Sequence, residues 1–374
     1  ERMKILKNGL QYRRNSSGLG VLIRELFVPL PAVTRRSCRV VLSQDSPDFP
    51  AQGRAEEIRC PYKNGQGIRR MLFQTFTLGR RYARDSILLT TDSKIPLFLP
   101  RSCVPLPVIT DLAVFRMPEV YQKSRVLWWR FQYRYLCRRA RYFAAISEFT
   151  KREMTEILKI PPERIRVIPC AASGNLAPET DGEVLAAVRA RYALPPQYVL
   201  FVGNNNPRKN LARLIRAFDR AVQGSPIPHH LVIAGEQGWK FDPETVLKDV
   251  QSRDRVHFIG FVPDGDMPAL YSAASLFLFP TLYEGFGIPV LEAQLCGTPV
   301  LTSGCSALPE VGGEGAVYVD PLDEADICRG MLQVLQDPGL AGKLREKGFA
   351  NAGRFSWERS ARLLNEWIEE EVAL

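Results

Sequence analysis

Two carboxylates and a pair of adjacent basic residues are the side chains of this sequence that are best suited to chemistry. Glu284 and Glu292 stand eight residues apart in the segment EGFGIPVLE, and Arg208 and Lys209 are neighbours in GNNNPRKN. Each carboxylate can accept hydrogen bonds from two hydroxyls of a polyol such as a hexose or a ribose. Arg offers fork geometry and Lys a mobile point charge, which together suit a pyrophosphate that gains charge as a bond to it breaks. The sequence therefore predicts a polyol site and a phosphate site.

Glycines accompany both groups. Gly203 ends an apolar run, and the basic pair then stands close to the start of an expected helix, where free N–H groups and the helix dipole favour an anion. Gly285 and Gly287 flank Phe286 and let the backbone come close to a ligand. The alternatives are a polar turn with exposed charges around the basic pair, and a surface loop with capping glutamates around the carboxylates.

Metal and histidine chemistry have less support. One or two carboxylates without further acidic neighbours form a poor Mg²⁺ site. Asp264 and Asp266 form an Asp-x-Asp pattern, but its place between a strand and a helix favours Asp266 as a helix N-cap. The eight cysteines lack zinc-site spacing, and the first 228 residues contain no histidine, so no imidazole base can come from that half. We expect no metal.

Short apolar runs alternate with helical periodicity along the chain, which is typical of parallel sheets covered on both faces. We therefore expect an α/β fold class in both halves. Because open α/β sheets bind ligands at the carboxyl ends of their strands, the loops after Gly203, Gly235, Gly260 and Pro280 should line one crevice. The expected strands are 86–91, 106–111, 142–147, 165–169, 198–203, 231–235, 256–260, 276–280 and 299–303. Helical segments are expected at 211–222, near 267–274 and near 289–296.

Charge is divided unevenly along the chain. The net charge is +10, but residues 1–172 contain 32 Lys and Arg residues against 14 Asp and Glu residues, which is +18, and the remainder carries −8. A basic half is expected to meet phospholipid headgroups, a pyrophosphate-bearing substrate or nucleic acid, and composition does not choose among them. No nucleic-acid motif with the spacing of known modules accompanies the charge, so no nucleic-acid partner is expected.

The densest basic segment is 124–142, and it has two interpretations. Helical spacing places four arginines on one stripe: Arg130, Arg134, Arg138 and Arg141. The opposite side collects Trp128, Trp129, Tyr133, Leu136 and Ala140. The segment is either an interfacial helix on an anionic membrane surface or a surface helix that packs on its own domain with solvated arginines.

Targeting segments are not expected. The longest apolar stretch, 86–115, is interrupted by Asp92, Lys94, Arg101 and four prolines, and the apolar run after Met3 is too short for the core of a secretory signal. We expect a cytoplasmic protein, with peripheral association on the inner face of the cytoplasmic membrane as the extension of that expectation.

The order of these strings resembles the retaining GT-B glycosyltransferases of the family 4 type, also called glycosyl transferases group 1. The family's Glu-x7-Glu signature stands here as Glu284 and Glu292. The similarity covers 198–357 closely and the N-terminal half loosely, through NSSGLG (15–20), ITDLAVFRMPE (109–119) and AAISEFTKREM (144–154). The PRKN and TDLAVFRMPE strings look most like bacterial mannosyltransferases of O-antigen and capsule assembly.

The resemblance implies two Rossmann-like doubly wound domains that face a crevice. Residues 1–180 would form the acceptor-side domain, residues 181–357 would bind the nucleotide sugar, and a helix at 358–374 would cross back to the first domain, docked by Trp367 and Ile368.

The resemblance also assigns roles at the donor site. Arg208 and Lys209 would bind the donor pyrophosphate, Glu284 the transferred sugar, and Glu292 the nucleotide ribose. The remaining donor-binding positions that it implies are Gly18 and Gly20 in a loop closing over the phosphates, Gly203, Phe261 near the base, and the amides of Gly285, Phe286 and Gly287.

One position departs from the family pattern. Many relatives have His before the Asp of ITDLAV, and here the residue is Thr110, which cannot carry a proton at neutral pH. Our hypothesis is that Asp111 orients either Thr110 or the acceptor hydroxyl.

The resemblance implies a retaining, metal-independent transfer of a hexose to a lipid-linked or polysaccharide acceptor, with no cofactor. The donor that it suggests first is GDP-mannose, from which mannose would be transferred. The alternatives are an enzyme with a small soluble acceptor, and a non-catalytic basic binding protein with an inactive nucleotide crevice.

Overall fold

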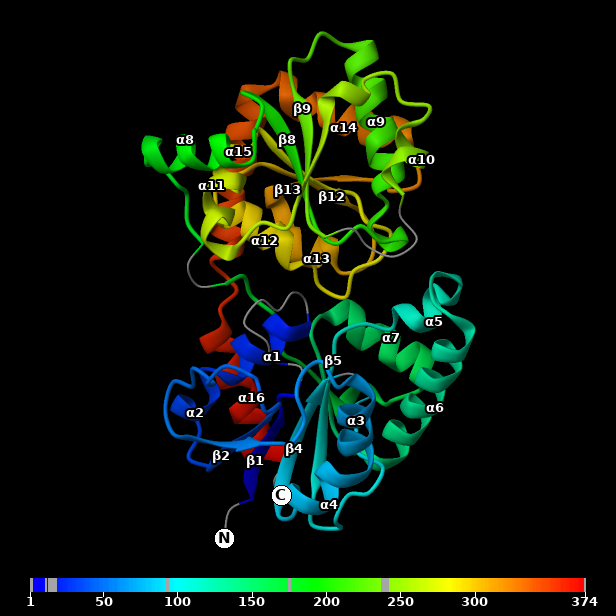
Figure 1. Cartoon of the computed structure of the whole chain (residues 1–374), viewed down its shortest axis with the longest axis vertical. Coiled ribbons are helices and arrows are strands. Elements are labelled where there is room, and N and C mark those ends of the chain that lie inside the picture. Colours follow the sequence, from blue (N-terminus) through cyan, green and yellow to red (C-terminus); the bar gives the residue numbers. More distant parts are fainter. Residues whose placement is uncertain are drawn as a thin grey trace. The chain divides into compact units, whose positions relative to one another are not determined.

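The computed structural model of this chain describes residues 3–10, 12, 19–91, 94–173, 176–236 and 242–372. It divides into two compact units, which are Glu1–Cys170 with Ser356–Leu374, and Ala171–Phe355 (Figure 1). The first unit ends at Cys170 rather than at residue 180. The segment after Cys170 already belongs to the second unit, because the Glu179 N–H donates to Ser272 Oγ at 2.9 Å.

The first unit is built on a seven-stranded parallel sheet with the order β3-β2-β1-β4-β5-β6-β7. Its strands are β1 Lys4–Asn8, β2 Cys38–Leu42, β3 Ala55–Arg59, β4 Ser86–Thr91, β5 Val104–Ile109, β6 Phe143–Ala145 and β7 Ile165–Val167. Its helices are α1 Leu19–Phe27, α2 Leu30–Val33, α3 Gly67–Leu72, the π-helical turn Phe73–Thr77, α4 Leu78–Tyr82, α5 Ala113–Arg116, α6 Lys123–Arg139 and α7 Glu148–Leu158.

The sequence predicts β4 to β7 but misses β1, β2 and β3. β1 is a central strand, yet it contains Lys7 and Asn8, both of which are buried. β3 has the sequence AEEIR, and none of its side chains is fully buried. Polar residues in these strands hide the continuous apolar run on which the prediction depends.

The second unit contains a six-stranded parallel sheet with the order β10-β9-β8-β11-β12-β13. Its strands are β8 Tyr198–Val202, β9 His230–Ala234, β10 Val256–Gly260, β11 Leu276–Phe279, β12 Val300–Ser303 and β13 Ala316–Val319. Its helices are α8 Gly182–Arg191, α9 Leu211–Gly224, α10 Pro243–Leu247, α11 Met267–Ser272, α12 Ile288–Leu295, α13 Leu308–Gly312, α14 Glu324–Gln336 and α15 Pro338–Ala352. All five expected strands are confirmed, and only the short, half-exposed β13 was missed.

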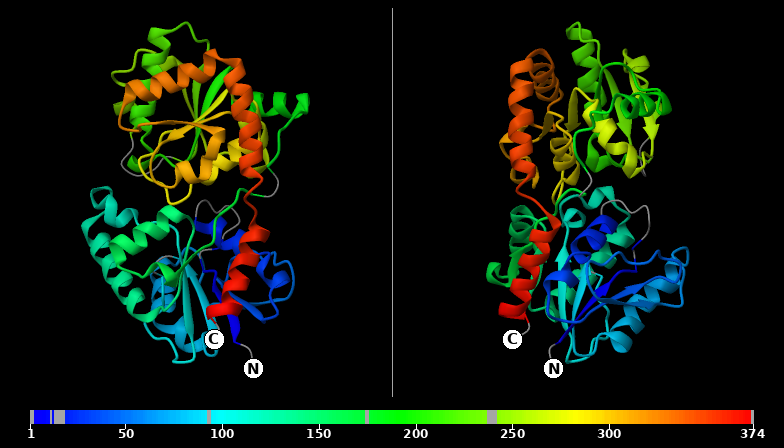
Figure 2. Two further views of the ribbon diagram at one scale, coloured as in Figure 1. Left: turned by 180° about the vertical axis from the view of Figure 1, so that it is seen from behind. Right: turned by 90° about the vertical axis from the view of Figure 1, so that its left-hand side faces the viewer.

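The strand order of each sheet reverses at one point. In the second unit the chain passes from β8 to β9 and β10, then returns to the other side of β8 for β11, β12 and β13. Helices cover both faces of this sheet (Figure 2), and Phe201, Phe277 and Phe279 are fully buried between the layers. The position between β8 and β11 is therefore a topological switch point, where open α/β sheets bind ligands.

The last helix packs on the first unit. α16 (Trp357–Trp367) continues into a π-helical turn, Ile368–Val372, and both Trp367 and Ile368 are buried. The rings of Trp367 and Tyr142 meet edge to face at 5.9 Å, and Arg36 pairs with Glu369 at 2.6 Å. The expected return of the C-terminal helix to the N-terminal domain is confirmed.

Candidate active site

The loops after β8 and β11 meet at the switch point of the second unit. After β8, Gly203 donates its N–H to the Ala234 carbonyl at 2.9 Å, which holds this loop against the end of β9. A Cβ at Gly235 would lie 2.2 Å from the Gly203 carbonyl oxygen, and Gly235 has a φ of +137°. Only glycine therefore permits the loops after β8 and β9 to approach this closely.

Arg208 and Lys209 lie in a single 3₁₀ turn, Pro207–Lys209, immediately before α9. Asn210 follows with a φ of +61°, and its side-chain amide donates to the Pro280 and Pro321 carbonyls at 2.9 and 2.6 Å. The Leu282 N–H donates to the Arg208 carbonyl at 2.9 Å. These bonds fasten the basic turn to the loop that leaves β11, so both loops form one rigid edge.

Lys209 and Glu284 form an ion pair at this edge. Lys209 Nζ lies 2.7 Å from Glu284 Oε1, and the two side chains are only 12% and 10% exposed. Burial by itself would raise the pKa of Glu284, but Lys209 and Arg208 outweigh burial and lower the pKa of this carboxyl below its usual value. Glu284 is therefore a carboxylate at neutral pH, and it already shares one oxygen with an ammonium group.

The backbone around Glu284 is held from both sides. The Glu284 N–H donates to Ser306 Oγ at 3.1 Å, and the Glu284 carbonyl accepts from the Ala307 N–H at 3.3 Å. Gly287 precedes α12 with a φ of +106°, and a Cβ there would lie 2.6 Å from Leu308 Cδ2. The glycine-rich loop is therefore a fixed turn that aims Glu284 toward Lys209.

Glu292 lies inside α12 and has a different partner. The Tyr271 hydroxyl, from α11, donates to Glu292 Oε2 at 2.8 Å. Burial raises the pKa of Glu292 to about 7, although the bond from Tyr271 acts in the opposite direction. The structure thus pairs Glu284 with the β8 loop and Glu292 with α11, and the pKa of about 7 places the titration of Glu292 near neutral pH.

Sequence reasoning missed Tyr271, Asn210 and Ser306. Tyr271 is fully buried in α11, and most of its sequence neighbours are the apolar residues expected in a core helix. The local sequence therefore gives no sign that its hydroxyl binds a carboxylate. Asn210 stands next to the predicted basic pair, and an Asn at a loop-to-helix junction is the signal that identifies it.

Asp266 occupies the N-cap position of α11, as predicted, but its side chain does not cap the helix. Its carboxylate makes no capping bond to α11, and instead accepts from Arg191 at 2.6 Å and from the Tyr192 hydroxyl at 2.6 Å. The ion pair and the hydroxyl bond satisfy the carboxylate better than a backbone N–H does. Among the residues that the structure describes, no group of three or more His, Cys, Asp and Glu side chains could hold a metal ion.

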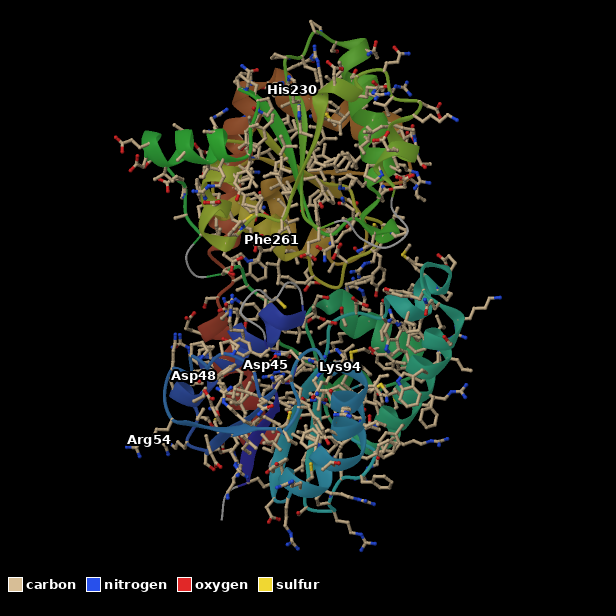
Figure 3. The ribbon with its side chains drawn as sticks, viewed as in Figure 1. Asp45, Asp48, Arg54, Lys94, His230 and Phe261 are labelled. Carbon is tan, nitrogen blue, oxygen red and sulfur yellow. The ribbon has the colours of Figure 1, made fainter. Side chains whose placement is uncertain are left out.

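The remaining predicted site residues are spread over both units. Phe261 follows β10 and is 49% exposed; Figure 3 places it at the opposite end of the second unit from His230, at the start of β9. In the first unit, Asp111 follows β5, and its Oδ1 accepts from the Ala113 N–H at 3.0 Å at the start of α5. Gly18 lies outside the described residues, and Gly20 is in the first turn of α1.

All four arginines of the predicted stripe are exposed: Arg130, Arg134 and Arg138 lie on α6, and Arg141 follows its end. Tyr133, Leu136 and Ala140 are buried, as expected for the opposite face. Trp128 is 42% exposed, which contradicts its assignment to that face. It lies about 100° around the helix from half-buried Trp129 and falls outside the buried arc. Within the described residues no helix is long and apolar enough to cross a membrane.

Two family models match this chain, one in each half. Residues 32–173 match Glycosyltransferase Family 4, and residues 189–351 match Glycosyl transferases group 1. The second match contains the basic turn and both carboxylates.

Similar curated proteins transfer sugars. The chain is 34% identical over 250 residues to the O-antigen chain mannosyltransferase B of Escherichia coli, covering 66% of this chain and 65% of that protein. It is 33% identical over 233 residues to the E. coli serotype-specific mannosyltransferase WbdA, covering 60% and 28%. A D-inositol 3-phosphate glycosyltransferase of Salinispora tropica is 34% identical over 235 residues, covering 57% and 47%. The match spans less than two thirds of the length of each relative.

Solved structures share the fold. Sucrose-phosphate synthase from Thermosynechococcus elongatus superposes with a TM-score of 0.76 at 20% identity, covering 99% of each chain. Anabaena HepE in complex with UDP-glucose superposes with a TM-score of 0.74 at 18% identity, covering 97% of this chain and 98% of HepE. The likeness confirms the expected GT-B class, two Rossmann-like doubly wound domains.

Proposed function

This chain belongs to the glycosyltransferases that combine a family 4 domain with a group 1 domain, and from that membership we propose that it transfers a hexose from a nucleotide sugar to another saccharide. The observation that carries the proposal is the Lys209–Glu284 ion pair, 2.7 Å long, at the switch point of the second unit. It combines a cation suited to phosphate with a carboxylate suited to sugar hydroxyls.

The basic turn is proposed to stabilise the leaving pyrophosphate. Lys209 has three N–H donors and uses one of them on Glu284, and Arg208 in the same turn adds a planar fork. Lys209 is held by Glu284 before the donor arrives, and with Arg208 it is proposed to stabilise the charge that develops as the bond from the sugar to phosphate breaks.

Glu284 is proposed to bind the transferred sugar without acting as a base. Its pKa is lowered and one oxygen faces Lys209, so it is a weak proton acceptor and a strong acceptor of hydroxyl hydrogen bonds. We propose a retaining transfer. The acceptor oxygen bonds to the anomeric carbon on the face that the phosphate leaves, and the acceptor proton passes to a phosphate oxygen. With two cations at the pyrophosphate, no metal is expected to be required.

Glu292 is proposed to hold the nucleotide ribose, with Tyr271 as a positioning residue. The hydroxyl bond of 2.8 Å occupies one carboxylate oxygen and leaves the other for ribose hydroxyls. The exposed Phe261, after β10, is proposed to lie near the base. The structure of HepE in complex with UDP-glucose supports a nucleotide sugar as the donor.

Mannose from GDP-mannose is the donor that we propose first, and a lipid-linked or polysaccharide chain is the proposed acceptor. The similarity to O-antigen mannosyltransferases supports this choice. The exposed arginines of α6 suit peripheral association with an anionic membrane, where a lipid-linked acceptor resides. Asp111, at the carboxyl end of β5, is proposed to orient the acceptor hydroxyl.

A soluble acceptor is the second candidate. The D-inositol 3-phosphate glycosyltransferase relative supports it, because its name gives a small phosphorylated acceptor. Activity on a water-soluble acceptor without lipid or detergent would favour this candidate over the first.

The test is a turnover assay with purified protein, several nucleotide sugars, and lipid-linked or soluble saccharide acceptors. We expect transfer from GDP-mannose, a product whose anomeric configuration by NMR equals that of the donor, and equal rates with EDTA and with Mg²⁺. Glu284→Gln is the matched control, because it keeps the shape of the side chain. Absence of turnover with every donor would instead favour a non-catalytic binding protein.

A further inference from the structure

We propose that the first unit contains a pocket for the phosphate headgroup of an anionic lipid, and that this pocket is the centre of a bilayer-docking surface. The pocket has a volume of about 560 Å³, which lies within the range of small-ligand sites. Four guanidinium side chains line it together with the segment 97–100; they are Arg80, Arg84, Arg101 and Arg139.

The pocket is separate from the candidate active site. Arg84 comes just before β4, Arg101 just before β5, and Arg139 is the last residue of α6. The pocket therefore lies at the amino ends of β4 and β5, whereas Asp111 follows the carboxyl end of β5. A six-residue strand such as β4 separates the two edges by roughly 20 Å.

The four pocket arginines share one cavity and, among the described residues, have no carboxylate partner there, in contrast to some other arginines of the unit. Arg36, Arg39 and Arg116 each pair with a carboxylate. Across the part of the chain that the structure describes, none of the four pocket arginines forms an ion pair with a carboxylate. Like charges around one cavity repel each other unless an anion lies between them, and phosphate matches the guanidinium fork best. The cavity therefore fits a phosphate group.

Exposed apolar side chains begin at the pocket and continue along the two helical segments beside it, which are residues 67–82 and α6. Phe98 is 43% exposed, with the Arg80 guanidinium 4.0 Å from its ring centre and the Phe76 ring at 6.1 Å. The Tyr135 hydroxyl donates to the Leu97 carbonyl and thereby ties α6 to the pocket segment. In the described part of the first unit, every large hydrophobic side chain with high exposure lies on these segments: Ile68, Met71, Leu72, Phe76, Phe98, Leu127, Trp128 and Phe131.

This combination favours a bilayer over a nucleic acid. Nucleic acid would use the arginines and the aromatic rings, but it offers nothing to Ile68, Met71, Leu72 and Leu127, which can leave water only by entering an apolar phase. Arginines beside exposed aliphatic and aromatic residues are the pattern of a surface that lies in a membrane interface. The α6 arginine stripe lies beside Leu127 and Phe131 and extends the same surface.

The inference rests on the proposed membrane association and names the part of the first unit that would contact the bilayer.

Vesicle co-sedimentation of the full chain tests the proposal, with phosphatidylcholine vesicles and with vesicles that also contain phosphatidylglycerol. The pocket variant R84A/R101A/R139A is compared with R35A/R54A/R166A, which removes three exposed arginines elsewhere in the same unit and changes the net charge equally. Figure 3 shows Arg54 on the β2–β3 side of the unit. Removing one pocket arginine is expected to weaken vesicle binding about fivefold, so the pocket variant should bind anionic vesicles roughly 100-fold more weakly.

The control variant should bind like the unaltered protein apart from a small loss that salt removes. Phe98→Ser should weaken binding even at high salt, because it removes apolar burial and leaves the charge unchanged. Equal losses in the two triple variants would overturn the proposal, and so would tighter binding of the pocket to RNA than to anionic vesicles.

Turnover separates this proposal from the proposed function. The pocket variant should keep full kcat on a water-soluble acceptor fragment, because none of its substitutions touches the active site. If no nucleotide sugar is turned over by any variant while the two triples still differ in vesicle binding, the proposed function fails and the lipid pocket stands. Circular dichroism melts of both triples verify that each is folded.

Discussion

Replacing Lys209 by Ala tests the candidate site most directly, since this side chain contributes both to catalysis and to the fold. In catalysis it is a preorganised cation at the proposed leaving group. Removing one such donor from other enzymes costs about 10²- to 10³-fold in kcat, or about 3 to 4 kcal/mol. We expect kcat for Lys209→Ala to fall by that order, with a smaller change in KM because other groups still hold the nucleotide.

The same substitution leaves Glu284 buried without its ammonium partner. The side chains of this pair are 12% and 10% exposed, so a lone carboxylate there loses its counterion in a poorly hydrated place. Breaking a buried pair by removing one member costs about 3 to 5 kcal/mol of unfolding free energy. Without Lys209 the pKa of Glu284 should also rise, because the first cation that opposes its burial is lost.

A double substitution separates the two effects. Lys209→Met with Glu284→Gln removes both charges and keeps the volume, so its stability should exceed that of Lys209→Met alone, while kcat stays as low as in Lys209→Met. Urea unfolding and single-turnover kinetics on the four proteins complete the cycle. A fall in kcat of less than about threefold for Lys209→Ala, or additive stability losses in the cycle, would refute the role assigned to this pair.

Further expectations concern the neighbouring residues. The pKa of Glu292 is about 7, and a carboxylate binds ribose hydroxyls best, so donor affinity should rise as the pH increases from about 6 to about 8. Donor binding should then release a proton, which calorimetry in two buffers measures. In Glu292→Gln the donor affinity should be independent of pH. Tyr271→Phe should raise KM for the donor and shift this pH profile while leaving kcat nearly unchanged; an unaltered profile would contradict its positioning role. Gly235→Ala should lower the melting temperature and weaken nucleotide binding, because its Cβ would lie 2.2 Å from the Gly203 carbonyl oxygen. Asp266→Asn should reduce stability, because it removes the ion pair with Arg191, and it should leave the response of turnover to EDTA unchanged. A change in that response would contradict our expectation that Asp266 does not bind a metal ion.

The sequence predicts the second unit better than the first for a physical reason. Strands that are buried on both faces, such as β8 and β11, contain only apolar residues and stand out. β1 occupies an equally central position, but two of its five residues are the buried polar side chains Lys7 and Asn8. Its local composition therefore does not show the apolar run that identifies a buried strand.

The candidate site shows the same division. Residue types and spacing identify the basic turn and both glutamates, because their chemistry is local. The partner of each glutamate depends on strand order: Lys209 is 75 residues from Glu284 in sequence, and Tyr271 comes from a helix on another crossover. The partner of the Asp266 carboxylate was missed for the same reason, since a capping interpretation considers only its own helix and Arg191 lies on α8.

The return of the last helix determines the order in which this protein can be completed on the ribosome. Trp367 and Ile368 fill the interior of a unit whose other residues end at Cys170, and the whole second unit is translated in between. At about 5 to 20 residues per second that interval lasts roughly 10 to 40 s. During this time the second unit, which is continuous in sequence, can fold to completion. The first unit still lacks its last helix, so the apolar site that Trp367 fills is exposed to water. The nascent chain therefore leaves this apolar site unfilled until Trp367 and Ile368 have been synthesised, and we expect a chaperone that recognises exposed apolar surface to bind there in the meantime.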